Sequence, residues 1–169
     1  VGLAKKANVL NERGIFILPG THSKHLICEN GKIVDFNTFM TGELFQVIAE
    51  HTLLKDSIED QPISSELFTD FDEGVLRNNG RHSLMNDLFK IRAAHLLGNR
   101  SPKQNFFYLS GLLIGQELSF LRSMSFDRLI LCAGENLAEF YIRALQILGF
   151  MDKTTILYRG DVVNSVVEE

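Results

Sequence analysis

The stretch of this sequence that decides its fold is GIFILPGTHSKHLICENGKIVDF, residues 14–36. Apolar runs at 15–18 and 25–28 have the length of short buried strands, and 32–38 alternates as a third strand. The pair Asn30-Gly31 between the last two is a strong signal for a two-residue hairpin, because both positions can adopt positive φ. The stretch therefore predicts three consecutive antiparallel strands.

Polar and small residues interrupt the apolar sequence directly after the first of these strands. Glycine lets the backbone approach a ligand closely, and successive N–H groups in such a turn form an anion-binding concavity. The hydroxyl groups of a threonine and a serine and the ammonium group of a lysine supply the other groups that a phosphate-binding loop needs. An ordinary hairpin turn explains the same composition, which by itself favours the turn by roughly two to one. The residues concerned are Gly20, Thr21, His22, Ser23 and Lys24.

The rest of the chain predicts helices first and then alternating strands and helices. In the third strand, alternation puts Val34 and Phe36 on one face and Asp35 and Asn37 on the other. The predicted order is β-β-β-α, a helical insertion, then β-α-β-α, which gives an α/β domain with a mixed five-stranded sheet and helices on both faces. The predicted later elements are helix 41–54, a polar surface excursion over 55–82 with one short helix, helix 83–98 with Leu84, Leu88, Ile91 and Leu96 on its apolar face, helix 101–122, strand 127–134, helix 135–150, strand 154–158 and the start of a helix after 160.

A second candidate site follows the strand that ends in LCAGEN. Ala133 and Gly134 come after an apolar strand and precede a helix, and this strand–glycine–helix arrangement receives nucleotides at the carboxyl ends of parallel strands. Glu135 or Asn136 could bond hydroxyl groups of such a ligand. A plain strand-to-helix turn with Asn136 as the helix N-cap is about equally well supported, since one glycine is not a fingerprint.

Two further segments carry small or polar residues at helical positions. Thr41, Gly42 and Glu43 open a helix, where Thr41 is a plausible N-cap and the helix N-terminus is an alternative anion site. Gly111 and Gly115 are four residues apart on one helix, which permits close backbone approach. Packing of this helix against a sheet is favoured over contact with a ligand in a cleft by roughly three to one.

Composition excludes several classes of protein. Hydrophobic residues make up 45% and charged residues 22% of the 169 positions, as in a soluble globular domain. The net charge of -4 argues against nucleic-acid binding, and no apolar run is long enough to cross a bilayer. Cys28 and Cys132 lie in apolar runs, which indicates buried, reduced thiols in a cytoplasmic protein. The histidines are scattered and predict no metal site, and no general base is evident.

Together these motifs resemble the 2-dehydro-3-deoxygalactonokinase family of the actin/hexokinase/Hsp70 ATPase superfamily. The resemblance rests on FILPGTHSKHL, TFMTGELF, FKIRAAHLLG, YLSGLLIGQEL and CAGENLAEFYIRAL, and it runs from about Gly2 to Val163. The strand order also resembles a ribonuclease-H-like unit. A nuclease of that fold needs acidic residues on its first strand, and this first strand has none.

The resemblance implies that residues 1–169 are the C-terminal lobe of a two-lobed sugar-acid kinase, with a helical insertion at about 55–125 and without the N-terminal lobe. It implies transfer of the ATP γ-phosphoryl group, with Mg2+, to the 6-hydroxyl of 2-dehydro-3-deoxy-D-galactonate in galactonate breakdown. It assigns the second phosphate loop to residues 20–24 and the adenosine motif to 133–136. We therefore expect the chain to fold without turning over, with its own N-terminal lobe, ATP and a sugar acid as partners.

Two alternatives remain open on the sequence. The chain could be a non-catalytic module of the same fold that senses a nucleotide or a sugar, or part of a kinase for a different sugar acid. Neither the acceptor, nor the metal ligands, nor the oligomeric state follows from these residues, and a homo-oligomer stays open.

Overall fold

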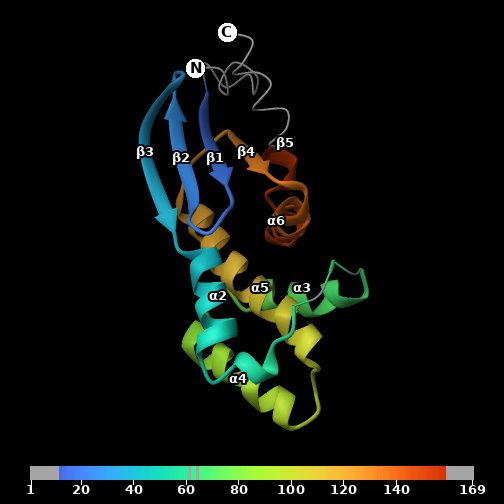
Figure 1. The fold of residues 1–169 in the computed structure, drawn as a ribbon. Coiled ribbons are helices and arrows are strands. Elements are labelled where there is room, and N and C mark those ends of the chain that lie inside the picture. Colours follow the sequence, from blue (N-terminus) through green and yellow to red (C-terminus); the bar gives the residue numbers. More distant parts are fainter. Residues whose placement is uncertain (1–11, 61, 64, 159–169) are drawn as a thin grey trace. The chain divides into compact units, whose positions relative to one another are not determined.

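The computed structural model describes residues 12–60, 62–63 and 65–158. The chain divides into two compact units, one made of Val1–Met40 with Ser123–Glu169 and the other of Thr41–Arg122. The first unit contains the sheet and the second is helical (Figure 1). The predicted α/β class with a mixed five-stranded sheet is confirmed.

The sheet has the predicted mixture of strand directions. Its order is β3-β2-β1-β4-β5, with β1 central. The β1–β2 and β2–β3 pairs are antiparallel, whereas β1–β4 and β4–β5 are parallel (Figure 1). The strands are β1 (Arg13–Leu18), β2 (Ser23–Glu29), β3 (Lys32–Phe39), β4 (Arg128–Ala133) and β5 (Thr154–Tyr158).

The hairpin between β2 and β3 forms where the sequence predicted it. Asn30 and Gly31 both have positive φ, at 50° and 73°, and Glu29 pairs with Lys32 around them. Two consecutive positive-φ residues match the twist of the flanking strands, which explains the preference for Asn-Gly at this turn.

The predicted alternation along β3 is wrong at Val34. Ile33 pairs with Cys28 and Asp35 pairs with Ile27, so the ladder has a bulge opposite the Ile27–Cys28 step. One extra residue in a strand reverses the facing of the residues beyond it. Ile33 and Phe36 therefore share one face although three positions separate them.

The centre of the sheet is buried on both faces. Phe16 and Ile130 belong to an apolar cluster on one face, and Ile15 and Ile17 on the other are fully buried. Within the described residues this unit has one α-helix, α6 (Glu135–Leu148), which joins β4 to β5 through η4 (Met151–Lys153). The helix predicted after 160 lies outside the described residues.

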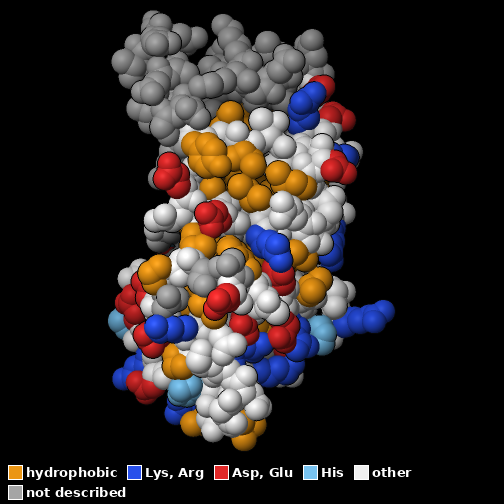
Figure 2. Space-filling model, turned by 90° about the vertical axis from the view of Figure 1, so that its right-hand side faces the viewer, with side chains coloured by type: hydrophobic (Ala, Val, Ile, Leu, Met, Phe, Trp, Pro, Cys, Tyr) orange, Lys and Arg blue, Asp and Glu red, His pale blue; other side chains and the backbone are white. Residues whose placement is uncertain are grey.

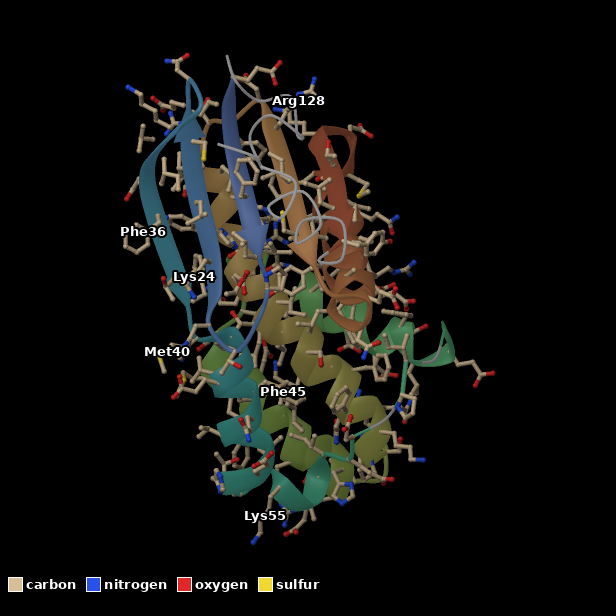
Figure 3. The ribbon with its side chains drawn as sticks, turned by 45° about the horizontal axis from the view of Figure 1, so that its top comes forward. Lys24, Phe36, Met40, Phe45, Lys55 and Arg128 are labelled. Carbon is tan, nitrogen blue, oxygen red and sulfur yellow. The ribbon has the colours of Figure 1, made fainter. Side chains whose placement is uncertain are left out.

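β3 forms an edge of the sheet and is exposed along most of its length. Phe36 has 63% of its surface exposed, and Figure 3 shows its side chain pointing away from the strand into open space. The backbone N–H of Phe36 donates to the carboxylate of the preceding Asp35 at 2.8 Å. This local bond occupies a donor that an edge strand would otherwise offer to another chain.

The helical unit is built around its longest helix, α5. The helix expected to start at Ser101-Pro102 does so, and it has a capping box: the Ser101 hydroxyl accepts from the Gln104 N–H and the Gln104 side chain accepts from the Ser101 N–H. The elements of the unit are α2 (Thr41–His51), η1 (Lys55–Ser57), η2 (Ser65–Leu67), α3 (Phe68–Leu76), α4 (Leu84–Leu96) and α5 (Pro102–Ser119), followed by η3 (Phe120–Ser123).

Two sequence expectations for this unit are wrong. The short helix expected within 55–82 is present as α3, but the segment is not a surface excursion, because α3 buries Phe71 and Val75 completely. Gly74 lies inside this helix and is itself buried. Leu96, expected on the apolar face of α4, is 67% exposed because it lies at the end of the helix.

The crossing of α3 and α5 depends on glycines from both helices. A Cβ on Gly111 would collide with the backbone carbonyl of Phe71, and a Cβ on Gly74 would collide with the backbone at Tyr108. A Cβ on Gly115 would lie 2.9 Å from Val75 Cα. The expected close approach exists, but its partner is the helix α3 and not a sheet.

A charged cluster supports the same crossing. Arg100 Nε donates to Asp70 Oδ1 at 2.8 Å and its Nη2 donates to Glu73 Oε2 at 2.6 Å. The guanidinium lies 4.1 Å from the centre of the Tyr108 ring. Tyr108 is 1% exposed, and desolvation raises the pKa of its hydroxyl. Only a planar guanidinium can stack on a ring and bond two carboxylates at once, so a lysine could not replace Arg100 here.

None of the helices in the described residues combines the length and hydropathy that a membrane-spanning segment needs. On the face shown in Figure 2, basic and acidic side chains are interspersed rather than gathered by sign.

We predict that Gly111→Ala lowers the free energy of unfolding by about 1–3 kcal/mol, because the new methyl group meets a backbone that cannot move aside. Alanine is favoured over glycine in an isolated helix by about 1 kcal/mol, so a gain in stability would contradict the packing role. Urea denaturation followed by circular dichroism measures the change. Gly20→Ala is the matched control, since its Cβ meets no atom within 4 Å.

Candidate functional site

Two turns that contain glycine lie at the same end of the sheet, where β1 and β4 finish. β1 and β4 are adjacent and parallel, with Ile17 paired to Leu131, so the chain leaves both strands at that end (Figure 1). The loop 19–22 follows β1, and Gly134 follows β4. β5 is parallel to β4, and Tyr158 pairs with Ala133 at the same end of the sheet. Carboxyl ends of neighbouring parallel strands are where open α/β sheets bind ligands.

The loop after β1 is shorter than the sequence suggested. β2 begins at Ser23 rather than at His25, which leaves residues 19–22 between the strands. Thr21 and His22 are exposed. Lys24 is also exposed, and its Nζ donates to the backbone oxygen of His22 at 3.3 Å, so the ammonium lies against the loop.

Gly20 faces open space. A Cβ built on it would meet no atom within 4 Å, and its φ lies outside the positive range. Neither packing nor backbone strain therefore requires a glycine in the chain itself. The absence of a side chain leaves the neighbouring volume accessible to a ligand that approaches the backbone.

The five predicted loop residues do not all face solvent. Ser23 is fully buried, because β2 has already begun and its side chains alternate between faces. His25, two residues on, is also fully buried, and its ring centroid lies 4.6 Å from that of Phe39. The structure thus presents Thr21, His22 and Lys24 outward and turns the Ser23 hydroxyl inward.

The turn after β4 does not have Asn136 as the helix N-cap, as one interpretation of the sequence had it. Gly134, not Asn136, is the N-cap of α6, with φ -72° and ψ 155°. Asn136 lies within the first turn and is exposed, as is Glu135, whereas Ala133 is buried. A Cβ on Gly134 would also meet no atom within 4 Å, so the backbone is open here as it is at Gly20.

A depression of about 280 Å³ lies beside this turn. Its walls come from the first turns of α6, through Glu135, Ala138 and Glu139, and from Tyr158 at the end of β5. Tyr158 is 44% exposed and supplies an aromatic face next to two carboxylates. Sequence reasoning missed Glu139 and Tyr158, although Glu139 follows Glu135 by one helical turn.

The candidates at the start of α2 make a contact that the sequence did not predict. α2 includes Thr41, and the Thr41 hydroxyl donates to Oε2 of Glu117 on α5. Glu117 is only 2% exposed, and sequence reasoning did not single it out. Gly42 and Glu43 follow in the first turn, half-buried. Gly111 and Gly115, the remaining cleft candidates, are buried in the crossing of α3 and α5 described above.

The two cysteines are free and buried, as predicted. Burial raises the pKa of Cys132 to about 11 and also raises that of Cys28. A thiol that stays protonated is a poor nucleophile, which argues against covalent catalysis at Cys132. No group of three or more His, Cys, Asp or Glu side chains in the described ranges could hold a metal ion.

The structure is an α/β domain in which two adjacent parallel strands, β1 and β4, are each followed by a turn with an open glycine. The model of the 2-keto-3-deoxy-galactonokinase family matches residues 1–160. A 2-dehydro-3-deoxygalactonokinase of Escherichia coli (strain K12) is 34% identical over 145 residues, covering 85% of this chain and 49% of the relative. A Rhizobium meliloti (strain 1021) protein named as a probable 2-dehydro-3-deoxygalactonokinase is 35% identical over 135 residues, covering 78% of this chain and 44% of the relative. The chain belongs to the 2-keto-3-deoxy-galactonokinase family.

A solved structure agrees with this assignment. A crystal structure from Sinorhizobium meliloti, described as a protein of the 2-dehydro-3-deoxygalactonokinase type, matches with a TM-score of 0.85 at 28% identity. The match covers 98% of this chain and 54% of that one. The chain thus spans about half the length of the relatives that it matches.

We predict that Cys132 reacts with iodoacetamide at pH 8 about 100-fold more slowly in the native chain than in urea. With a pKa of about 11, about one thiol in a thousand is ionised at that pH, against about one in ten at the ordinary value of 9.0. Peptide mapping by mass spectrometry separates Cys132 from Cys28. Equal labelling rates in the folded and unfolded chain would contradict the burial.

Proposed function

We propose that this chain is the nucleotide-binding C-terminal lobe of a kinase that transfers the γ-phosphoryl group of ATP to the 6-hydroxyl of 2-dehydro-3-deoxy-D-galactonate, a step of galactonate breakdown. The family match supports the reaction. The observation that carries the assignment of the nucleotide site is the pair of open glycine turns, Gly20 and Gly134, on the parallel neighbours β1 and β4.

The loop at residues 20–24 is the proposed phosphate-binding element. The open backbone at Gly20 admits a phosphate, the exposed Thr21 hydroxyl donates to it, and Lys24 adds a positive charge beside the loop. His22 is exposed in the same loop. Ser23 contributes through its backbone, because its side chain is buried. Such cradles stabilise anions mainly through backbone N–H groups and fixed positive charge.

The turn at 133–136 and the depression beside it form the proposed adenosine site. Gly134 keeps the backbone open to a flat base or a ribose, and Ala133 before it is buried at the end of β4. Glu135 and Glu139 can accept hydrogen bonds from ribose hydroxyls, as acidic residues do in other nucleotide-binding α/β folds. Tyr158 offers a ring for stacking, since almost half of its surface is exposed.

Phosphoryl transfer depends on positioning and on neutralising negative charge. The exposed loop residues fit the phosphates, but the described residues supply no metal cluster. Mg2+ would therefore reach the site on the phosphates of ATP, to which it binds with few protein ligands. The base that accepts the proton of the sugar hydroxyl, and the contacts to the sugar acid, are proposed to come from the N-terminal lobe.

The proposed lobe is ribonuclease-H-like, with three antiparallel strands followed by two parallel ones. The helical unit Thr41–Arg122 is then the insertion, and it starts earlier than the predicted boundary at about 55. Its first-turn residues Thr41, Gly42 and Glu43 stay candidates for the cleft. A cytoplasmic location is proposed from the two reduced thiols.

We predict that Gly20→Val and Gly134→Val affect nucleotide binding in different ways. Gly20→Val should weaken binding of ATP at least about tenfold, a loss of 1.4 kcal/mol or more, and leave adenosine binding unchanged. Gly134→Val should weaken the binding of both ATP and adenosine. Isothermal titration calorimetry on the chain measures these constants, and thermal melting checks that both variants fold, as their open surroundings lead us to expect. Equal effects of Gly20→Val on ATP and adenosine would refute the phosphate loop.

We also predict that the 169-residue chain does not turn over alone. ADP release from ATP with 2-dehydro-3-deoxy-D-galactonate, followed by a coupled assay, should stay at background, with the Escherichia coli relative as positive control. A comparable rate on the chain alone would contradict the two-lobed assignment. A panel of sugar acids tested with the longer protein that contains this chain decides the acceptor, and no phosphorylation of this acid would refute the substrate.

A further inference from the structure

The depression of about 280 Å³ beside the turn after β4 has a lining of mixed chemistry. Glu135 and Glu139 line it from α6, together with Ala138, and Tyr158 lines it from the end of β5. Ala138 is only 1% exposed, so most of the accessible lining comes from the two carboxylates and the tyrosine. A ligand in this depression therefore meets two acidic groups, a small apolar surface and an aromatic ring.

Glu135 and Glu139 are placed to act as a pair. Residues four apart on a helix lie on the same face, with about 5–6 Å between their Cβ atoms. Both side chains are exposed, and among the described residues neither carboxylate has a hydrogen-bond or ion-pair partner. An ionised carboxylate accepts hydrogen bonds and donates none. The pair therefore suits a ligand with two neighbouring donors, such as the 2′- and 3′-hydroxyls of a ribose.

Tyr158 offers a contact that does not depend on the identity of a base. Its ring stands where β5 ends beside Ala133, and 44% of its surface is exposed. Stacking tolerates any base, because every base has a π-face. An amide side chain reads a base edge with a donor and an acceptor side by side, but no amide of the described residues lines the depression, since Asn136 is exposed outside its lining. The lining thus has groups that recognise a sugar and none that distinguishes bases.

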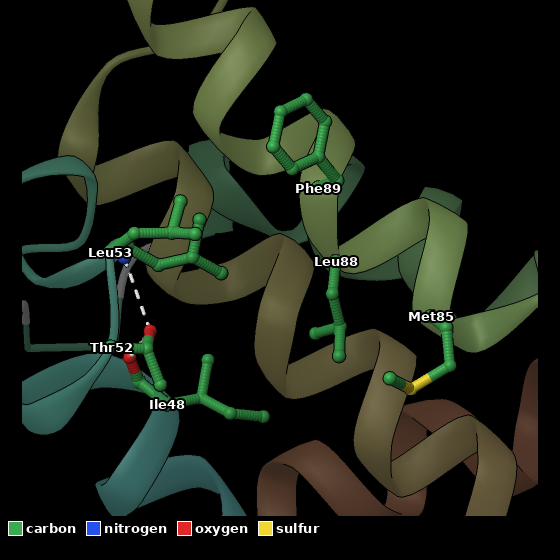
Figure 4. A pocket seen from close by; sticks show the side chains of 7 residues that line it. Ile48, Thr52, Leu53, Met85, Leu88 and Phe89 are labelled. Atoms are coloured by element: carbon green, nitrogen blue, oxygen red, sulfur yellow. Dashed lines mark hydrogen bonds between the residues drawn. The ribbon is translucent and has the colours of Figure 1, made fainter.

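A second hollow, of about 270 Å³ between α2 and α4 of the helical unit, has the opposite chemistry (Figure 4). Its lining is mostly large apolar side chains such as Met85 and Phe89. The hydroxyl of Thr52, which also lines it, donates to the Ile48 carbonyl at 2.6 Å and accepts from the Leu54 N–H at 3.1 Å. A sugar diol would find this shared hydroxyl in the groove, against two free carboxylates in the depression.

We propose that the depression selects the sugar of the phosphoryl donor and tolerates its base, so that the chain binds ribonucleoside triphosphates with different purines and discriminates against 2′-deoxyribonucleotides. This inference rests on the proposed nucleotide-binding function and deepens it. A site built to bond a hydroxyl rejects an analogue without that hydroxyl, because its acceptor loses a partner. Water can replace the hydroxyl at exposed carboxylates, so we expect a loss of about tenfold and not the much larger factors of buried sites.

Isothermal titration calorimetry of the chain with ATP, GTP and 2′-deoxy-ATP tests the proposal. 2′-Deoxy-ATP should bind about tenfold more weakly than ATP, and GTP should bind within about threefold of ATP. The double variant Glu135→Ala/Glu139→Ala should bind ATP as weakly as 2′-deoxy-ATP. Glu139→Gln should keep the preference for ATP, because its amide oxygen still accepts. Glu66→Ala removes an exposed carboxylate outside the lining and is the matched control, which should also keep the preference.

Variants of Tyr158 test the tolerance for bases in the same titrations. Tyr158→Ala should weaken all three nucleotides by the same factor, about tenfold, because it removes the stacking surface. Tyr158→Phe should leave the three affinities unchanged, because it keeps the ring. Thermal melting confirms that each variant is folded.

The outcomes separate this inference from the proposed function. Equal affinities for ATP and 2′-deoxy-ATP would refute the recognition of ribose and leave the proposed nucleotide site intact. A preference for ATP over GTP of more than about tenfold would refute the tolerance for bases. A preference for ribose that survives the double variant would place the recognition on groups outside the depression. Binding of none of the three nucleotides would refute the nucleotide site itself, and this inference with it.

Discussion

The parallel pairing of β1 with β4 is the constraint on which the rest of this structure depends. It joins residues more than a hundred positions apart, since Gly14 pairs with Arg128, and the whole helical unit lies between them in the chain. Ile15 and Leu129 face each other in this ladder, both fully buried. A slip of one residue would turn every side chain of a strand to the opposite face, so burial on both faces holds the register. That register sets the two candidate ligand turns side by side.

Glycine has two opposite roles in this chain. At Gly20 and Gly134 the missing side chain leaves open space beside the backbone, which suits a ligand. At Gly74 and Gly111 the missing side chain is replaced by the backbone of the neighbouring helix. The same residue type thus supports a site in one unit and a helix crossing in the other. Nothing in the local sequence separates the two roles, because both depend on what lies across from the glycine.

Much of the fold could be predicted because it rests on short-range chemistry. The Asn30-Gly31 turn and the helix start at Ser101-Pro102 follow from backbone preferences within four residues, and both are present. α3 was expected only as one short helix within a polar surface segment, and its burial was missed because it comes from contact with α5. The bulge at Val34 was missed because alternation assumes an unbroken ladder, and the ladder depends on the partner strand.

The candidate site, like the fold, was predicted only in part. The sequence by itself determined the strands, their turns, and the residues 20–24 and 133–136 as ligand candidates, because φ preferences, caps and apolar runs are local properties. Only the tertiary structure decided that Ser23 faces inward, that Tyr158 joins Glu135 and Glu139 around one depression, and that Thr41 bonds Glu117. Each of these depends on strand register or helix packing, which bring together residues far apart in the chain.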